Sequence, residues 1–367
     1  MISDLFESVP NFSEGRDSSL IDAIARAASR AHVLDVDPDP DHHRVVVSMA
    51  GARERLLEGL MAAVAVAVDR IDLGAHLGVH PRVGAADVIP IVPLGEAGLD
   101  TARDAARELG ARIWNELRVP VYFYGYDEDW TLADIRAGRA QPDLGGPDLH
   151  PTAGAVCVGA RRLLVAFNVV LPGASVGEAR AVARSLRESA GGMRGVMALA
   201  FELPGRALQL SMNLFRLDET TPDDVLRELD RRGVRFESPQ VVGLCPAVAS
   251  TAAASGRVLE GRIGDAVAAE GARRCRQRGG EEHTALAGRL EKEATGLRQL
   301  GAGQDELLAG AERCAALAPV LAAAGVLDPE LDGLGRLAAL GVRAALTPET
   351  ERAYAARVAA LDRTLAG

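Results

Sequence analysis

The distribution of apolar and polar residues divides the chain into two parts near residue 255. Before that point, short apolar or alternating runs are separated by stretches in which apolar residues recur every three to four positions, so strands are predicted to alternate with amphipathic helices. The predicted strands are 5–10, 32–36, 45–50, 88–93, 119–124, 163–171, 196–201, 207–212 and 240–244. The predicted helices are 18–30, 52–70, 99–116, 175–188 and 222–231. Asp17 and Thr221 are expected to cap two of these helices, the second with Pro222 at its first position.

The order of the elements predicts the fold class. Residues 5–93 follow the order β-α-β-β-α-β, and residues 163–244 repeat it. This order is typical of the ferredoxin-like arrangement, in which two split β-α-β units form an antiparallel sheet. We therefore expect an α+β protein of two ferredoxin-like subdomains with a cleft between them, where ligands commonly bind. Two unrelated α+β units are the alternative. In each copy an asparagine lies near the end of the first strand, Asn11 and Asn168.

Beyond residue 255 the sequence becomes rich in Ala, Leu, Arg and Glu with helical spacing, interrupted at 279–280, 301–303 and 346–348. This pattern predicts a tail of several antiparallel helices that serves for packing or assembly. The expected domains are 1–155, 156–256 and the helical tail 257–367.

Composition excludes several kinds of protein. The net charge is −10 and no basic cluster is present, which argues against a nucleic-acid partner. The chain starts without the basic and apolar regions of a signal peptide, and no stretch approaches the roughly 18 uncharged apolar residues of a membrane span. We therefore expect a cytoplasmic protein with no membrane contact. The cysteines are too far apart to suggest a zinc site or a disulfide framework: Cys157, Cys245, Cys275 and Cys314.

Four of the seven histidines lie in two loops, 35–44 and 76–87, which also carry Gly, Pro and charged residues. Catalytic groups concentrate in loops held by a rigid scaffold. His80 is the candidate for acid–base chemistry, because an imidazole titrates near neutrality and can take up and return a proton. It precedes Pro81, which favours an extended conformation, and Asp87 follows shortly after. A structural histidine is the alternative.

The same loops offer two further kinds of site. Arg44 and Arg82 are candidates for binding a carboxylate, since a guanidinium pairs with it in a bidentate way. Solvated surface arginines are the alternative. The four loop histidines also have the chemistry of metal ligands, but two of them would share a helix face only in a helix, which Gly78 and Pro81 disfavour. We expect no metal.

A third segment, 145–154, is glycine-rich at its start and leads into an apolar run. It is expected to line the cleft, or else to be a plain linker between the subdomains. It lacks the G-x-x-x-x-G-K-[ST] pattern of a phosphate loop.

Nine segments, in order over roughly residues 5–250, together carry a resemblance to a known family: 9–15, 34–37, 76–84, 119–125, 150–154, 159–161, 166–169, 211–214 and 242–244. They read VPNFSEG, LDVD, HLGVHPRVG, VPVYFYG, HPTAG, GAR, AFNV, SMNL and VGL. The chain resembles glutamate formimidoyltransferase, also called formiminotransferase, without a cyclodeaminase domain.

The resemblance implies a folate-binding tunnel between two ferredoxin-like subdomains. It implies transfer of a formimidoyl group from N-formimidoyl-L-glutamate to N5 of tetrahydrofolate, the co-substrate, in histidine degradation and one-carbon metabolism. The catalytic histidine of the family falls on His80. Its folate-binding stretch falls on Gly146, Pro147, Asp148, Leu149, His150, Pro151, Thr152, Ala153 and Gly154. We expect substrate contacts from Asn11, Asp37, Arg44, Arg82 and Asn168, and a homodimer.

Several positions depart from the family pattern, and a lysine that is usual near Gly195 and Val196 is absent. Leu77 and Val79 stand where the family often has a lysine and a glutamate, and Val170 stands where it usually has an asparagine. A carboxylate beside His80 would orient it or raise its pKa. The alternatives are therefore a divergent folate-binding paralogue with another donor or no catalysis, and a metal-dependent hydrolase that uses the loop histidines.

Overall fold

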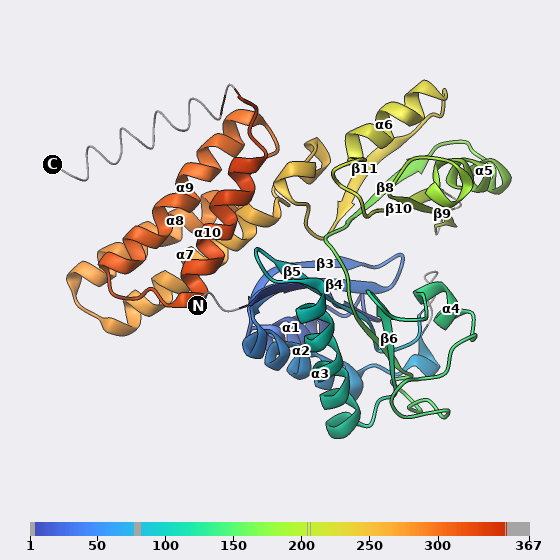
Figure 1. Ribbon diagram of the computed structural model, residues 1–367, viewed down its shortest axis with the longest axis horizontal. Helices are drawn as coiled ribbons and strands as arrows, with labels where there is room; N and C mark the ends of the chain where they lie inside the picture. Colours follow the sequence, from blue (N-terminus) through green and yellow to red (C-terminus); the bar gives the residue numbers. More distant parts are fainter. Residues whose placement is uncertain (1–3, 77–81, 204, 206, 349, 351–367) are drawn as a thin grey trace. The chain divides into compact units, whose positions relative to one another are not determined.

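The computed structural model describes residues 4–76, 82–203, 205, 207–348 and 350 (Figure 1). Described residues up to 163, together with 200–209, form one compact unit. Residues 164–199 and those from 210 onward form the other.

The first unit is built on a sheet whose centre has ferredoxin-like order. Strand β4 pairs antiparallel with β3 on one side and with β1 and β2 on the other, and β5 pairs with β1 and β2 in turn. The strands are β1 (Leu5–Ser8), β2 (Asn11–Phe12), β3 (His32–Asp39), β4 (Arg44–Ala52) and β5 (Ala86–Leu94), with helices α1 (Ser18–Ala28) and α2 (Arg53–Arg70). The predicted β-α-β-β-α-β unit is confirmed, and Asp17 caps α1 as expected by accepting from the N–H groups of Ser19 and Leu20.

Two further strands extend this sheet in parallel. Strand β7 (Val156–Ala160) pairs with β5, and β6 (Val121–Gly125) pairs with β7. Helix α3 (Leu99–Leu117) connects β5 to β6. Helices α1, α2 and α3 cover one face of the sheet (Figure 1), and the large side chains between them are fully buried, among them Phe6, Phe12, Ile24, Met49, Leu60, Ile89 and Leu109. The opposite face carries a second, smaller buried cluster that includes Val88, Tyr122, Tyr124, Ile135 and Cys157.

The second sheet repeats the ferredoxin-like order, β11-β8-β10-β9. Its elements are β8 (Val165–Leu171), α5 (Val176–Leu186), η2 (Glu188–Ala190), β9 (Val196–Glu202), β10 (Leu208–Leu214), α6 (Pro222–Arg231) and β11 (Glu237–Val242). Ser175 and Thr221 begin the two α-helices with reciprocal capping boxes, and Pro222 occupies the first turn of α6 as predicted.

The predicted helical tail is present. After two short 3-10 turns, η3 (Ala247–Ala249) and η4 (Ala252–Ala254), it consists of α7 (Leu259–Arg278), α8 (Glu281–Arg298), α9 (Gln304–Ala323) and α10 (Pro329–Ala344). Helix α7 packs against the other three (Figure 1). Glu260 at its start is buried and accepts a hydrogen bond from the backbone N–H of Ala247, 2.7 Å away. Among the helices in the described ranges, none is both long enough and apolar enough to cross a bilayer.

Candidate active site

The face of the first sheet opposite helices α1, α2 and α3 carries a continuous row of side chains. The strand register aligns, from β3 to β6, the residues Asp37, Val46, Asn11, Val88, Cys157 and Tyr122. Side chains two residues apart on a strand share a face. Arg44 therefore lies on this face, two residues before Val46 and opposite Asp39. Three of the predicted substrate-binding residues, Asn11, Asp37 and Arg44, thus share one surface.

The Nε atom of Arg44 has no hydrogen-bond partner among the described residues. That atom is buried, and within the part of the chain that the structure describes nothing accepts from it. Burial lowers the pKa of Arg44, and the charges of Asp39 and Asp87 oppose this shift while that of Arg136 adds to it. A buried guanidinium donor is costly to leave unpaired, so this position favours an anionic ligand.

The β3–β4 turn places His42 and His43 directly before Arg44. His42 is buried, and its Nδ1 lies 2.6 Å from Oδ2 of Asp39, while its backbone N–H donates to Oδ1 across 2.8 Å. Burial raises the pKa of Asp39, but the hydrogen bonds from His42 outweigh it and hold the pKa below its ordinary value. His43 has a left-handed backbone with φ of +50°, and its Nδ1 accepts from the N–H of Gly15 across 3.1 Å.

Arg82 joins the two histidine-bearing loops. Its Nη1 donates to the carbonyl of His43 and its Nη2 to the carbonyl of His42, each across 3.1 Å. The same Nη1 lies 2.7 Å from Nε2 and 2.9 Å from Nδ1 of His76. The ring of His76 stacks on that of His43, with centroids 4.0 Å apart and an interplanar angle of 30°. We call Gly15, His43, His76 and Arg82 the turn-anchoring cluster.

Both stacked imidazoles are neutral near pH 7. Burial, with the charges of Arg82 and His43, lowers the pKa of His76 to about 4. Burial also lowers the pKa of His43, although Glu14 opposes the shift. Each ring therefore keeps an unprotonated nitrogen that accepts hydrogen bonds.

The predicted folate-binding stretch lies beside the second loop. Backbone N–H groups of Leu73 and Ala85 donate to the carbonyls of Thr152 and Ala153, each across 2.9 Å. Gly154 allows this approach: its φ is +68°, and a Cβ there would lie 2.2 Å from the carbonyl oxygen of Val83. The residues on both sides of 77–81 are thus tied to 152–154.

The remaining predicted residues are distributed as follows. His80, Leu77 and Val79 lie outside the described residues. Asn168 is buried in β8 of the other compact unit, and its contribution to substrate binding stays a prediction. In the described ranges no group of three or more His, Cys, Asp or Glu residues is arranged to hold a metal ion.

Arg136 was not predicted as part of this region. It belongs to the short helix α4 (Leu132–Arg136) and donates from Nη2 to Asp87, 2.9 Å away. The available signal was the capping box formed by Thr131 and Asp134, which marks the start of the helix.

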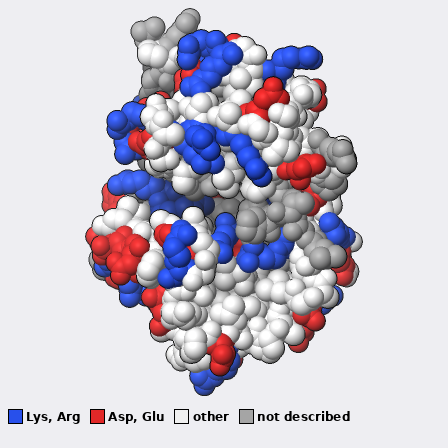
Figure 2. All heavy atoms as spheres, turned by 90° about the vertical axis from the view of Figure 1, so that its right-hand side faces the viewer, with Lys and Arg blue, Asp and Glu red and all other residues white. Residues whose placement is uncertain are grey.

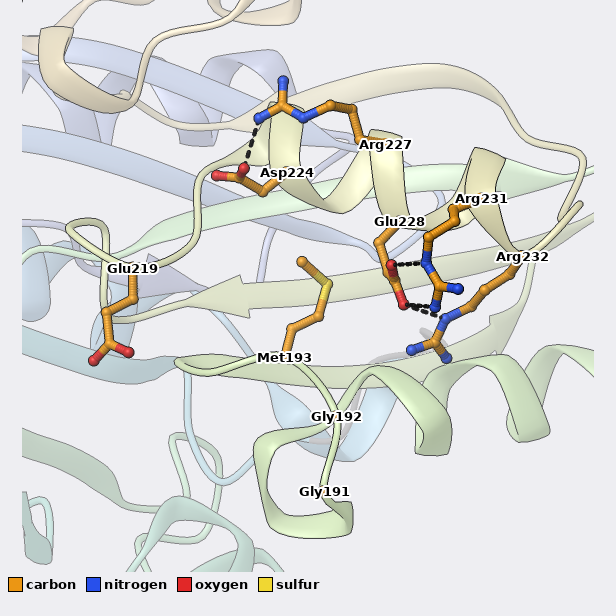
Figure 3. A pocket seen from close by; sticks show the side chains of 9 residues that line it. All are labelled: Gly191, Gly192, Met193, Glu219, Asp224, Arg227, Glu228, Arg231 and Arg232. Atoms are coloured by element: carbon orange, nitrogen blue, oxygen red, sulfur yellow. Dashed lines mark hydrogen bonds and ion pairs between the residues drawn. The ribbon is translucent and has the colours of Figure 1, made fainter.

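A surface depression of about 470 Å³ lies in the second unit, beside α6 (Figure 3). Its charged side chains are paired: Arg227 with Asp224, Arg231 and Arg232 with Glu228, and Glu219 with Arg194 and Arg216. Because these charges are already paired, the depression is a weaker candidate for the active site than the face of the first sheet that carries Arg44. Basic and acidic side chains are also interspersed over the face of the molecule that Figure 2 draws.

Comparison with known proteins adds an independent observation. Residues 5–161 match the formiminotransferase domain, N-terminal subdomain. The chain is 35% identical over 269 residues to glutamate formimidoyltransferase of Thermoplasma acidophilum, covering 66% of this chain and 88% of that protein. It is 33% identical over 269 residues to glutamate formimidoyltransferase of Streptococcus pyogenes serotype M1, covering 67% and 90%. It is 35% identical over 275 residues to formimidoyltransferase-cyclodeaminase of Rattus norvegicus, covering 67% of this chain but 51% of the rat protein.

Proposed function

Because the chain belongs to the glutamate formimidoyltransferase family, we propose that it transfers a formimidoyl group from N-formimidoyl-L-glutamate to N5 of tetrahydrofolate. This reaction belongs to histidine degradation and one-carbon metabolism. The observation that carries the proposal is the identity to the archaeal enzyme over most of that protein's length. Tetrahydrofolate acts as co-substrate in this reaction.

The chemistry requires one proton transfer that a histidine can perform. N5 of tetrahydrofolate attacks the formimidoyl carbon, a bond forms, and a tetrahedral intermediate results. The bond from that carbon to the glutamate nitrogen then breaks, and the amine leaves well only when protonated. We assign His80 to take the proton from N5 and deliver it to the departing nitrogen. Such general acid–base catalysis typically contributes about 10²–10⁴-fold, and holding the two substrates together accounts for much of the remaining rate.

Arg44 is the better supported of the two proposed carboxylate-binding arginines. Its buried Nε has no acceptor within the described residues, whereas both amino groups of Arg82 donate to backbone carbonyls. Asp37 and Asn11 lie in the adjacent row of the same sheet face and are proposed to contact the substrates. Residues 146–154 are proposed to bind the folate. Thr152 and Ala153 accept hydrogen bonds from Leu73 and Ala85, which lie before and after His80 in the sequence.

An assay of purified protein with tetrahydrofolate and N-formimidoyl-L-glutamate tests the function. We expect turnover by the wild type and a loss of about 10²–10⁴-fold in kcat for His80→Ala. His283→Ala in the helical tail is the matched control and should keep wild-type turnover. Unchanged turnover in His80→Ala would refute the catalytic assignment.

Two other outcomes separate the alternatives. Tight folate binding by the wild type without turnover would favour the non-catalytic paralogue that the departures at Leu77 and Val79 suggest. Turnover that a metal chelator abolishes would favour a metal-dependent enzyme.

A further inference from the structure

We propose that Arg82 is a positioning residue: it holds the β3–β4 turn so that Arg44, the next residue along the chain after His43, presents its guanidinium to an anionic group of the substrate. That this group is a carboxylate of the formimidoyl donor rests on the proposed function. The role of Arg82 in holding the turn is independent of the proposed function.

The hydrogen bonds of Arg82 hold the backbone of the β3–β4 turn. A carboxylate is recognised in a bidentate way when two neighbouring N–H groups of a guanidinium point at it. In Arg82 the two amino groups instead donate to the carbonyls of His42 and His43, and Nη1 also contacts His76. Both amino groups of the Arg82 guanidinium are therefore engaged by the protein, so its Nη1/Nη2 edge is not open to a carboxylate.

The turn needs such an anchor because of the conformation of His43. A left-handed backbone with φ of +50° is disfavoured for a residue with a Cβ and persists only where its surroundings enforce it. Two other contacts of the turn-anchoring cluster act with Arg82 at this residue. Gly15 donates to its Nδ1, and His76 stacks on its ring. Gly15 also backs the turn closely, since a Cβ on it would lie 2.6 Å from the backbone nitrogen of Arg44.

The constrained backbone of His43 also fixes the position of Arg44. The conformation of His43 sets the direction in which the chain enters β4, and Arg44 is the first residue of that strand. Its neighbour across the strands, Asp39, is already bound by His42. A turn that relaxed would let the Arg44 side chain turn toward solvent or toward Asp39, and the unpaired buried Nε would be lost as a donor for a ligand.

A double-mutant cycle tests whether Arg82 acts through Arg44. The variants are Arg44→Gln, Arg82→Gln and the double variant, each assayed for kcat/KM toward N-formimidoyl-L-glutamate at saturating tetrahydrofolate. We expect losses on the order of 100-fold for Arg44→Gln and on the order of 10-fold for Arg82→Gln, in keeping with hydrogen bonds to charged groups. The double variant should match Arg44→Gln to within about threefold, because coupled residues are not additive. A double variant whose loss is the product of the two single losses would overturn the proposal, since Arg82 would then act on the substrate or the fold independently.

A second measurement is independent of catalysis. Hydrogen–deuterium exchange without substrate should become faster for the amides of residues 41–46 in Arg82→Gln and stay unchanged there in Arg44→Gln. Exchange in helix α7 is the internal reference and should not change. Unchanged exchange in the turn of Arg82→Gln would also overturn the proposal.

The two experiments test the role of Arg82 separately from the proposed function. If the wild type fails to transfer the formimidoyl group, the proposed function falls, while the exchange experiment still decides whether Arg82 anchors the turn. If Arg82→Gln does not fold, Arg82→Lys replaces it in both experiments, because an ammonium keeps the charge but does not reproduce the planar fork.

Discussion

Arg136 donates from Nη2 to the carboxylate of Asp87 across 2.9 Å and thereby joins helix α4 to the strand that follows the second histidine-rich loop. Asp87 is buried, and its other oxygen accepts from the backbone N–H of Val83 across 2.5 Å. One carboxylate therefore holds both the helix and the end of the loop.

Neutralising this carboxylate should destabilise the first unit. Asp87→Asn leaves the charge of Arg136 unpaired, with its buried Nε also lacking an acceptor in the described part of the chain. We expect the free energy of unfolding to fall by about 2 kcal/mol, less than for a fully buried pair, because the Arg136 side chain is 24% exposed. Urea unfolding measures this difference. Arg139→Gln breaks an exposed ion pair with Asp134 and should leave the midpoint unchanged; equal losses in both variants would contradict the role assigned to Asp87.

Gly154 should be far less tolerant of alanine than a glycine with the same backbone in open space. Gly138 has φ of +69° with no atom near a built Cβ, whereas Gly154 has φ of +68° with the Val83 carbonyl oxygen at 2.2 Å. We expect Gly138→Ala to cost about 1 kcal/mol from the left-handed backbone alone, and Gly154→Ala to cost about 3 kcal/mol or more because the backbone segments must separate. Thermal unfolding of the two variants compares them directly. Equal costs would show that the close approach to Val83 is not needed.

The neutral His76 predicts a specific dependence of stability on pH. Its pKa is about 4 in the folded protein and 6.5 ordinarily, so between these values the unfolded chain binds a proton that the folded chain does not. The contribution of His76 to the free energy of unfolding is therefore fully present above about pH 6.5 and decreases as the pH falls toward 4. His43 acts in the same direction.

His76→Gln removes this titration while keeping an acceptor for Arg82. We expect the wild type to lose on the order of 1 kcal/mol more than the variant between pH 7 and pH 4, a modest amount because the ring is half-exposed and screened by solvent. Urea unfolding across this range gives both curves. Parallel curves would mean that the folded and unfolded proteins protonate position 76 alike.

The buried Glu260 predicts the opposite trend in the helical tail. Burial raises its pKa to about 7, from an ordinary value of 4.5. Its stabilising effect is thus present below pH 4.5 and is lost as the pH rises through 7. Glu260→Gln keeps an acceptor for the Ala247 N–H and should exceed the wild type in stability by about 2 kcal/mol at pH 8 but not at pH 5. Glu282→Gln at the exposed start of α8 is the control and should show no such change with pH.

Much of the fold was predictable because its strands and helices bury one face each. The alternation in 32–36 and the helical spacing in 18–30 both follow from a single buried side. Strand β7 was not predicted, since all five of its residues are buried and no alternation marks it. The predicted strand 5–10 ends earlier, as β1 at Ser8, and a separate strand β2 begins at Asn11, after Pro10, which has no N–H to donate to a ladder.

The candidate site was predictable only in part. The types of residue in the two histidine-rich loops indicated chemistry, and the structure brings His43, His76 and Arg82 into contact. The partners of Arg82 were not predictable, because they are backbone carbonyls, which every residue carries. A side-chain pattern therefore cannot distinguish an arginine that anchors a turn from one that binds a ligand.

The hydrogen bonds that join Leu73, Val83 and Ala85 to residues 152–155 have a consequence for how the sequence can vary. These hydrogen bonds run from main chain to main chain, through Leu73, Ala85 and Ala155 as donors. The side chains of Asp87 and His150 add to them by accepting from the N–H groups of Val83 and Ala153. The other side chains along these segments can therefore vary without loss of these backbone hydrogen bonds.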